Sequence, residues 1–534
     1  MCVVSNCHYS PLGDTISWTH GLLRLTFSLN HRKINMMVLL EIITGVLVAI
    51  WEFAMSYLLY WIFSKGKIPG PLSFPVLGTR WIFSWFGRYQ IDKVHDAYKD
   101  LNRRYGPVCK EEALWNHPVI SVFSRNDIEM VMRRSSRFPI RPPQEVISSY
   151  RRSRQDRYTN LGLVNEQGET WHKLREALTP ELMGASTVLG FFPALNQVSD
   201  ELIQLIKHLR TGSTISSFED IAYKVGLEST CTLILGRHLG FLKPNSCSLT
   251  SRLAKAVRIH FTASRDAFYG LPLWKILPTT AYRQLIESED EIYSIISELL
   301  DTTIQEQDEN ARDEPVEAVF QSILKDKNLN IKDKRAAIID FIAAGIHTLG
   351  NTLVFIFHLI GSNSKVQQEL YEEVINLAPA GCNIAAEDLS TAKYLRACIT
   401  EAFRVIPTAP CIARILDEPI NVSGYKIDAG SVVLLHTWIA GLEDSNFKNA
   451  KEWMPERWLK PTAPHSPLLV APFGFGRRIC PGKRFIEKAL QLIVAKVVRE
   501  YEIVAQDELQ LQFEYILAPK GPVSLHFKDR QNFL

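Results

Sequence analysis

The chain lacks the features that mark disulfide scaffolds, zinc proteins and nucleic-acid binders. Its nine cysteines are odd in number and scattered, with no C-x-x-C pair, which argues against a disulfide framework or a zinc site. The formal net charge of +3 over 534 residues is too small to indicate a nucleic-acid partner. The sequence also has no flavin or nicotinamide fingerprint, so redox chemistry here needs electrons from outside the chain.

The composition indicates an ordinary globular protein. Hydrophobic residues make up 46% and charged residues 22% of the chain, which is enough for a large core. Helical periodicity continues from about residue 80 without a linker, so we expect one large domain over 81–534. Residues 1–35 are polar and poor in acids, which is typical of a mitochondrial presequence or of an extension ahead of the true start.

An apolar segment, 36–65, precedes the globular part. Its central stretch, Val38 to Phe63, is long enough at about 1.5 Å per residue to cross a bilayer core of roughly 30 Å. Glu41 and Glu52 oppose a span, because a carboxylate is costly at mid-membrane. The segment is predicted to be a membrane anchor, with an interfacial or targeting helix as the alternative. Prolines and glycines then predict a hinge over 66–80.

A glycine-rich loop near the C-terminal end carries the chemistry. Residues Phe473 to Gly482 read F-G-F-G-R-R-I-C-P-G and hold one cysteine, Cys480. A cysteine thiolate is a strong, soft ligand for iron. Three glycines are expected to take positive φ and to bring the backbone close to a flat cofactor: Gly474, Gly476 and Gly482.

Cationic groups accompany this cysteine in the sequence. Arg477 and Arg478 precede it, and positive charge lowers the pKa of a thiol and can pair with carboxylates on a cofactor rim. A helix is predicted to begin just past Pro481, with its N-terminal dipole directed at the sulfur. A glycine-rich turn around an ordinary buried cysteine is the alternative interpretation.

Two helical stretches hold polar groups at informative spacing. Trp171 and Arg175 lie four residues apart and share one helix face, a pattern that by itself describes a half-buried Trp beside a surface Arg. Ala336 to Ile360 is a long apolar stretch with polar residues at its centre, among them His347 and Thr348. This pattern predicts a core helix of a large protein rather than a second membrane span.

A buried ion-pair network is predicted in the C-terminal half. Glu401 and Arg404 are three residues apart in an apolar helical context, so they can pair, and a buried pair needs further hydrogen bonds. Arg457 is the natural third member. Two prolines in 407–413 exclude a continuous helix there, so this apolar segment is a candidate for pocket lining, with Arg414 directly after it.

An arginine-rich stretch lies between Val131 and Arg157. It contains eight arginines and only two acids, Glu145 and Asp156. One interpretation is a basic surface for an acidic partner or a membrane. The other is a solvated loop whose charges bind nothing specific.

Taken together, these motifs resemble the cytochrome P450 superfamily, the haem-thiolate monooxygenases, over roughly residues 67–530. Within the superfamily, four stretches resemble the mitochondrial clan and, in it, the arthropod ecdysone 20-monooxygenases; they begin at Arg137, Leu163, Ile338 and Pro472. The resemblance implies a mostly α, single-domain fold with small β-sheets. It also implies haem b (iron protoporphyrin IX) between a long central helix and the Cys-ligand loop.

The resemblance assigns a role to each motif. It makes Cys480 the axial ligand of the haem iron and makes Thr348 a proton-handling hydroxyl. His347 stands where the family has Asp or Glu; it is predicted to relay protons, with a histidine hydrogen-bonded within the core as the alternative. The implied cofactor-binding residues are Trp171, Arg175, Gly345, Arg414, Phe473, Gly476, Arg478, Cys480 and Gly482. The implied structural residues are Glu401, Arg404 and Arg457.

The implied activity is hydroxylation of ecdysone at C20 with O₂ and external electrons. Lys483 and Arg484 resemble the clan's ferredoxin-docking surface, whereas Thr400 stands where a lysine is often found. The expected electron donor is an adrenodoxin-like ferredoxin with NADPH-ferredoxin reductase, or NADPH-cytochrome reductase if the chain is in the endoplasmic reticulum. The clan indicates the mitochondrial inner membrane, whereas the anchor-like helix indicates the endoplasmic reticulum.

Three alternatives to this activity stay open at the level of sequence. The same chemistry can act on another sterol or on a xenobiotic. A haem-thiolate isomerase or dehydratase needs no O₂; His347 in place of the acid favours it, and the retained Thr348 argues against it. A non-catalytic, membrane-held steroid-binding protein is disfavoured by the complete motif set.

Overall fold

The protein separates into two compact units, 1–67 and 68–534, and the second holds the globular fold. The computed structural model describes residues 41–49, 51–52, 54–55, 68–74, 76–134, 136–236, 238–244, 248–309, 319–327, 329–460 and 467–530. In the first unit, the described residues are helical and exposed. The rest of the predicted anchor and the whole of the predicted presequence lie outside the described residues.

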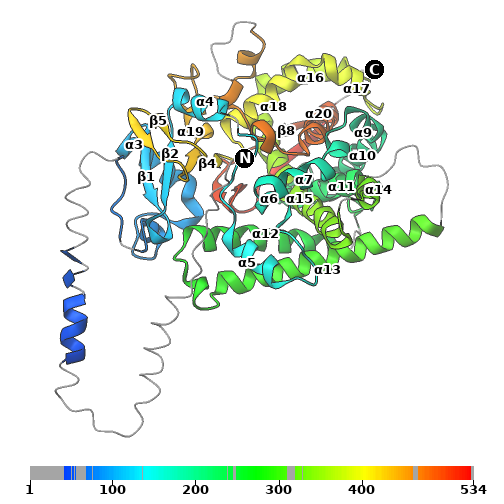
Figure 1. Ribbon diagram of the computed structural model, residues 1–534. Helices are drawn as coiled ribbons and strands as arrows, with labels where there is room; N and C mark the ends of the chain where they lie inside the picture. Colours follow the sequence, from blue (N-terminus) through cyan, green and yellow to red (C-terminus); the bar gives the residue numbers. More distant parts are fainter. Residues whose placement is uncertain are drawn as a thin grey trace. The chain divides into compact units, whose positions relative to one another are not determined.

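Helices make up most of the second unit. In chain order they are α3 (Val94–Tyr105), α4 (Arg125–Arg133), α5 (Glu145–Ser153), α6 (Gly162–Asn165), α7 (Gly168–Leu178), α8 (Pro180–Met183), α9 (Ala185–Gly190), α10 (Phe192–Leu209), α11 (Phe218–Leu235), α12 (Ser248–Tyr269), α13 (Thr280–Glu309), α14 (Val319–Lys325), α15 (Ile331–Gly361), α16 (Ser364–Ile375), α17 (Ala386–Thr391), α18 (Lys393–Val405), α19 (Thr437–Gly441) and α20 (Lys483–Glu500). Helices α12 and α13 run side by side below α15 in Figure 1.

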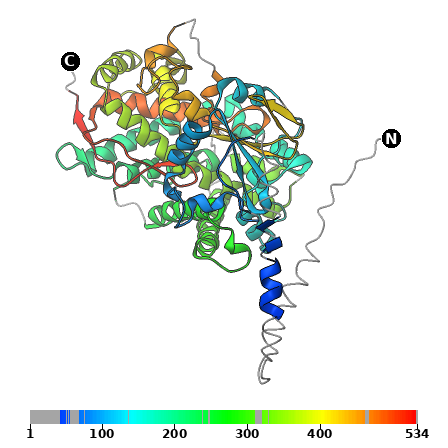
Figure 2. The ribbon, with the colours of Figure 1, turned by 90° about the vertical axis from the view of Figure 1, so that its left-hand side faces the viewer.

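The strands form four small sheets. In chain order they are β1 (Val108–Glu112), β2 (Pro118–Val122), β3 (Thr214–Ile215), β4 (Ile412–Ile415), β5 (Ile420–Val422), β6 (Tyr425–Ile427), β7 (Val432–Leu435), β8 (Tyr501–Val504), β9 (Leu511–Phe513), β10 (Leu517–Pro519) and β11 (Leu525–Asp529). The largest sheet has the order β1-β2-β7-β4, with a parallel β2–β7 pair between two antiparallel pairs. Figures 1 and 2 both show this sheet to one side of α20.

Helix α15 lies in the core, as its apolar pattern predicts. Among the described residues it is the one helix long and apolar enough to cross a membrane, but 67% of that apolar window is buried inside the protein. The Asn330 side chain caps it by accepting a hydrogen bond from the Asp333 N–H. Gly226 on α11 permits close packing, because a Cβ there would lie 2.4 Å from the Ile346 carbonyl oxygen.

Some local structure also follows from the sequence. The short apolar stretches 118–123 and 432–436 predict strands, and they correspond to β2 and β7. Asn126, which follows the first of these stretches, is a plausible N-cap by sequence. That prediction is wrong, because α4 begins at Arg125 and Ser124 occupies the cap position. The stretch 515–525 also predicts strand with a turn at 519–522, and there β10 and β11 are separated by a turn with Gly521 at φ +76°.

Candidate active site

The cysteine loop folds back on itself before α20. The Cys480 N–H donates to the Phe473 carbonyl at 2.8 Å, and Gly476–Arg478 forms a short 3₁₀ turn, η7. Gly474 and Gly476 have φ of +76° and +67°, as predicted. The prediction for Gly482 is wrong: its φ is −79°, and it is the N-cap residue directly before α20. Phe473 packs edge-on against Phe403 of α18, with ring centroids 5.5 Å apart.

The protein around Cys480 disfavours a free thiolate. Burial raises the pKa of this thiol, and the opposing effects of the Gly482 and Lys483 backbone N–H groups and of Arg175 and Arg141 do not outweigh it. Neighbouring arginines therefore lower the thiol pKa as expected, but burial outweighs them and the net pKa is raised. A buried thiol of this kind becomes an anion when a metal cation takes it as a ligand.

Four arginines gather beside the cysteine loop: Arg141, Arg175, Arg414 and Arg478. Burial lowers the pKa of each of them, with mutual repulsion adding to it for Arg141, Arg414 and Arg478. The pKa falls to about 10 for Arg414 and to about 9 for Arg478. Within the described residues, none of the four forms an ion pair with a carboxylate. We refer to them as the cationic cluster.

Neutral groups hold the cationic cluster in place. Arg478 donates to the carbonyls of Pro139 (2.9 Å) and Glu166 (2.8 Å), and its guanidinium lies 3.9 Å from the ring centroid of Trp171. Arg414 donates to the Phe475 carbonyl at 3.0 Å. Trp171 on α7 thus supports Arg478 directly, whereas sequence reasoning had paired it with Arg175.

The cationic cluster and Cys480 together fit an iron porphyrin. A soft sulfur donor suits the iron, and buried cations without protein counter-ions suit the two carboxylates on the porphyrin rim. Arg141 is the member that sequence reasoning missed as a site residue. Its only signal was its place in the arginine-rich stretch, and its side chain donates to the carbonyl of Arg478, 337 residues away.

The polar residues of α15 face different neighbours. The Thr348 hydroxyl donates to the Ala344 carbonyl at 2.6 Å. His347 is only 1% exposed, shares a 2.8 Å hydrogen bond through Nε2 with the Ala254 carbonyl, and lies with its ring centroid 4.1 Å from that of Tyr223. Burial lowers its pKa to about 4, so the ring is neutral near pH 7. This orientation does not support a proton relay through His347.

Gly345 packs against α11. A Cβ at this position would lie 2.1 Å from the Thr230 hydroxyl oxygen, so only glycine allows the two helices to approach this closely. The resemblance had assigned its small size to room beside a haem. The contact with Thr230 gives it a different physical reason.

The predicted ion-pair network is present and closed. The Glu401 carboxylate lies 2.6 Å from Arg404 Nη2 and 2.8 Å from Arg457 Nε, and it accepts from Trp458 Nε1 at 2.8 Å. Arg404 also donates to the carbonyl of Gly441 at 2.7 Å. All of these charges are therefore paired and hydrogen-bonded inside the chain, as a buried ion pair requires.

Several members of the arginine-rich stretch pair within the protein. Arg151 binds Asp340 of α15, and both Arg154 and Arg157 bind Asp290 of α13. These three arginines are therefore paired within the protein and do not form a free basic surface.

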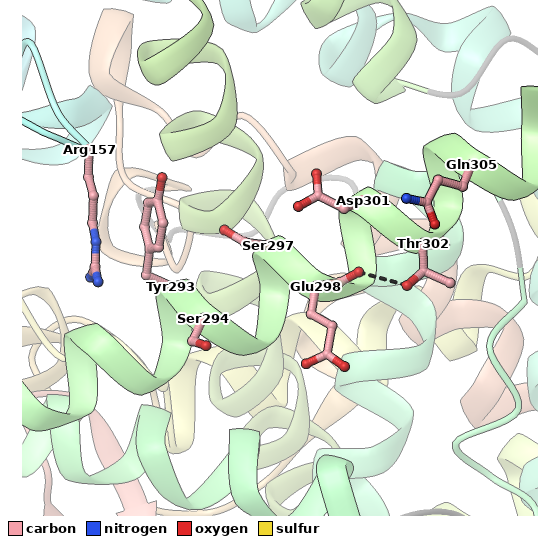
Figure 3. Close-up of a pocket in the computed structure, with 8 residues that line it drawn as sticks. All are labelled: Arg157, Tyr293, Ser294, Ser297, Glu298, Asp301, Thr302 and Gln305. Carbon is pink, nitrogen blue, oxygen red and sulfur yellow. Dashed lines mark hydrogen bonds between the residues drawn. The ribbon is translucent and has the colours of Figure 1, made fainter.

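A pocket lies along α13, apart from the cysteine loop. Figure 3 shows the eight residues that line it: Arg157, Tyr293, Ser294, Ser297, Glu298, Asp301, Thr302 and Gln305. None of them is a predicted site residue, and every one of them carries a polar group, unlike the mostly apolar residues of a steroid pocket.

Comparison with known proteins decides the family. The cytochrome P450 family model matches residues 69–527. The chain belongs to the cytochrome P450 family. Its fold is the P450 fold, it is a P450 monooxygenase, and its cofactor is haem b.

Three relatives illustrate where the chain lies within the family. It is 43% identical over 479 residues to a Drosophila melanogaster protein named ecdysone 20-monooxygenase, covering 87% of this chain and 88% of the relative. It is 27% identical to cytochrome P450 302a1, mitochondrial, from the same fly, covering 87% and 95%. It is 26% identical to the rat mitochondrial 1,25-dihydroxyvitamin D(3) 24-hydroxylase, covering 87% and 89%. P450s of this kind take electrons from redox partners.

Proposed function

We propose that this P450 hydroxylates ecdysone at C20 to give 20-hydroxyecdysone. The observation that carries the proposal is the 43% identity to the fly ecdysone 20-monooxygenase across nearly the whole length of both chains. The presence of both Thr348 and the complete cysteine loop in the sequence also supports monooxygenation over rearrangement.

Bound haem b supplies the oxygen-activating and C–H-oxidising chemistry. The residues of this chain would do the rest. Cys480 would hold the iron as a thiolate, and the cationic cluster would hold the rim carboxylates. The Thr348 hydroxyl would hold and pass a proton on the cofactor side of α15. His347 would remain neutral against Ala254 and Tyr223, consistent with its pKa of about 4.

We propose an adrenodoxin-like ferredoxin, served by NADPH-ferredoxin reductase, as the electron donor. Relatives with mitochondrial names support this choice. Lys483 and Arg484, at the first turn of α20, would contribute to the docking surface. For the N-terminal part we propose a presequence over 1–35, a membrane-associated helix over 36–65 and a hinge over 66–80, with the mitochondrial inner membrane as the location. Exposed Ile42, Leu47 and Trp51 support membrane contact.

Turnover under isotopically heavy O₂ tests the proposal. The haem-loaded chain would be combined with ecdysone, a ferredoxin and its reductase, and the product read by mass spectrometry. We expect one heavy oxygen atom at C20. A parallel reaction with NADPH-cytochrome reductase tests the alternative donor. Absence of product from protein whose reduced CO complex has the thiolate spectrum would contradict the substrate or the donor, but not the assignment of Cys480.

A further inference from the structure

One face of α15 carries a charged group that the mechanism above does not use. Asp340, Ala344 and Thr348 recur every four residues and therefore share a helix face. Ala344 is exposed, and Asp340 and Thr348 are half-buried, whereas Ile346 and His347 are buried on other sides of the helix. Two helical turns, about 12 Å, separate Asp340 from Thr348. Asp340 therefore lies on the Thr348 side of α15, at a distance spanned by a large ligand.

Arg151 of α5 fixes the position of this carboxylate. Its Nη2 lies 2.5 Å from Asp340 Oδ1, and its Nη1 donates to Oδ2 at 2.9 Å. The Arg151 side chain is 7% exposed and also donates to the Leu161 carbonyl at 3.1 Å, while the Asp340 side chain is 21% exposed. The arginine is thus enclosed by protein, and the carboxylate keeps part of its surface open.

Gly162, the first residue of α6, packs against the pair. A Cβ on Gly162 would lie 2.1 Å from Arg151 Nη1 and 2.7 Å from Asp340 Oδ2, and its φ is +77°, so the position requires glycine. The same helix, α6, and the residue after it supply the carbonyls of Leu163 and Glu166 to Arg478. The Arg151–Asp340 pair and the cationic cluster therefore border the same short helix.

The charges around the pair balance. Glu289 of α13 lies 2.8 Å from His260 of α12. Burial raises the pKa of Glu289, but His260, Arg151 and Arg157 outweigh it and lower the pKa overall. Tyr158 stacks on the Arg151 guanidinium at 4.8 Å. Because the Arg151 guanidinium already neutralises Asp340, the open lone pairs of this carboxylate suit a neutral hydrogen-bond donor.

We propose that Asp340, positioned by Arg151, accepts a hydrogen bond from a hydroxyl group of the substrate at the end remote from the oxidised carbon. This assigns the Asp340 face of α15 to neutral, polyhydroxylated steroids, rather than to amines or to sterols without a hydroxyl at that end. The inference rests on the proposed ecdysone substrate and names the group that selects it. A site built to bind a hydroxyl rejects analogues without it, because its own polar group is then left unpaired.

Equilibrium dialysis of labelled steroids against the haem-loaded protein tests this without turnover. Each variant would be measured with ecdysone and with a steroid of the same skeleton that lacks the hydroxyls. We expect Asp340→Asn to weaken ecdysone binding about tenfold or more, because the bond to a charged acceptor is lost. Binding of the hydroxyl-free steroid should change less than twofold to threefold.

Two further variants separate recognition from folding. Replacing both partners, Arg151→Met with Asp340→Leu, removes the acceptor without leaving a buried charge, so the fold should survive while ecdysone selectivity is lost. Asp301→Asn is the matched control: Asp301 also pairs with an arginine, Arg335 at 2.6 Å, but it lies on α13 in the pocket of Figure 3. It should leave both affinities unchanged.

The outcomes distinguish the two proposals. Selective loss of ecdysone affinity in both Asp340 variants supports the inference. Equal weakening for both steroids means a purely structural ion pair and overturns it, as does undiminished ecdysone binding by Asp340→Asn. Failure of the wild-type protein to bind ecdysone overturns the proposed substrate, and this inference with it.

Discussion

Two groups of arginines differ in where their counter-charges are. Arg404 and Arg457 share the carboxylate of Glu401 at 2.6 and 2.8 Å. The cationic cluster of Arg141, Arg175, Arg414 and Arg478 has no carboxylate partner among the described residues, and burial lowers the pKa of every member.

The difference separates structure from function. Burying a charge without a partner is costly, so a chain keeps such charges only where something else completes them. The Glu401 network is complete within the chain and stabilises the fold. The charges of the cationic cluster are balanced only by an anion from outside the chain. In a P450, the carboxylates of the haem supply that negative charge. The predictions below change one partner at a time, from the largest expected effect to the smallest.

Arg404→Met should be the most damaging change. It leaves the carbonyls of Gly441, Ala450 and Glu452 without their donor and leaves Glu401 with less positive charge. We expect the free energy of unfolding to fall by about 3–5 kcal/mol, measured by denaturant titration of the haem-free and haem-loaded proteins alike. Arg152→Met, at an exposed position, is the control. A loss confined to the haem-loaded form would contradict a purely structural network.

His347 should affect stability in acid rather than proton delivery. Its pKa falls from 6.5 to about 4 on folding, so between these values the unfolded state binds more protons and stability falls as the pH falls. The loss approaches roughly 3 kcal/mol near pH 4. His347→Phe should flatten this part of the pH–stability curve, although His436 and His95 act in the same direction.

A matched pair of variants tests in turnover whether His347 takes part in proton delivery. His347→Phe should keep most of the product formed per electron pair, whereas Thr348→Val should divert electrons to peroxide. For the pH–stability curve of His347→Phe, the control is His117→Phe, at an exposed position. If His347→Phe instead loses this coupling of electrons to product, the result would contradict the account and support a proton relay through His347.

Arg414→Met should weaken haem binding and leave the haem-free fold almost unchanged. In the haem-free protein, the guanidinium of Arg414 carries a desolvation cost. Removing that cost offsets the loss of its hydrogen bonds to the Ala413 and Phe475 carbonyls. We expect haem affinity to fall by about 10- to 100-fold, the value of a bond to a charged group, measured by haem transfer to an acceptor protein. Destabilisation of the haem-free protein as large as that of Arg404→Met would erase the distinction between the two groups.

Gly345→Ala should destabilise the haem-free protein less than Arg404→Met does. The new Cβ would meet the Thr230 side chain at 2.1 Å, and overpacking of this kind costs about 1–3 kcal/mol. Thermal unfolding of the haem-free protein would measure it, and adding Thr230→Ala should recover most of the loss. An intact haem-free protein with impaired haem binding would instead favour the role beside the cofactor.

The sequence predicted what local spacing determines. The E-x-x-R spacing on a helix brings Glu401 and Arg404 together, and the apolar run around Thr348 marks a core helix. It could not predict which way a side chain leaves that helix, because the packing of α11 and α12 turns His347 toward Ala254 and Gly345 toward Thr230. The sequence also could not predict contacts between distant segments, such as those of Arg151 with Asp340 and of Arg141 with the loop of Arg478.

The central claim is that carboxylates of the cofactor complete the cationic cluster. A double-mutant cycle tests it directly, with haem and its dimethyl ester, which lacks the two negative charges, binding to the wild-type protein and to Arg414→Met. We predict a coupling free energy of about 1.5–3 kcal/mol, so that the ester binds the two proteins almost equally well. Additive effects, with no coupling between Arg414 and the carboxylates, would contradict the account.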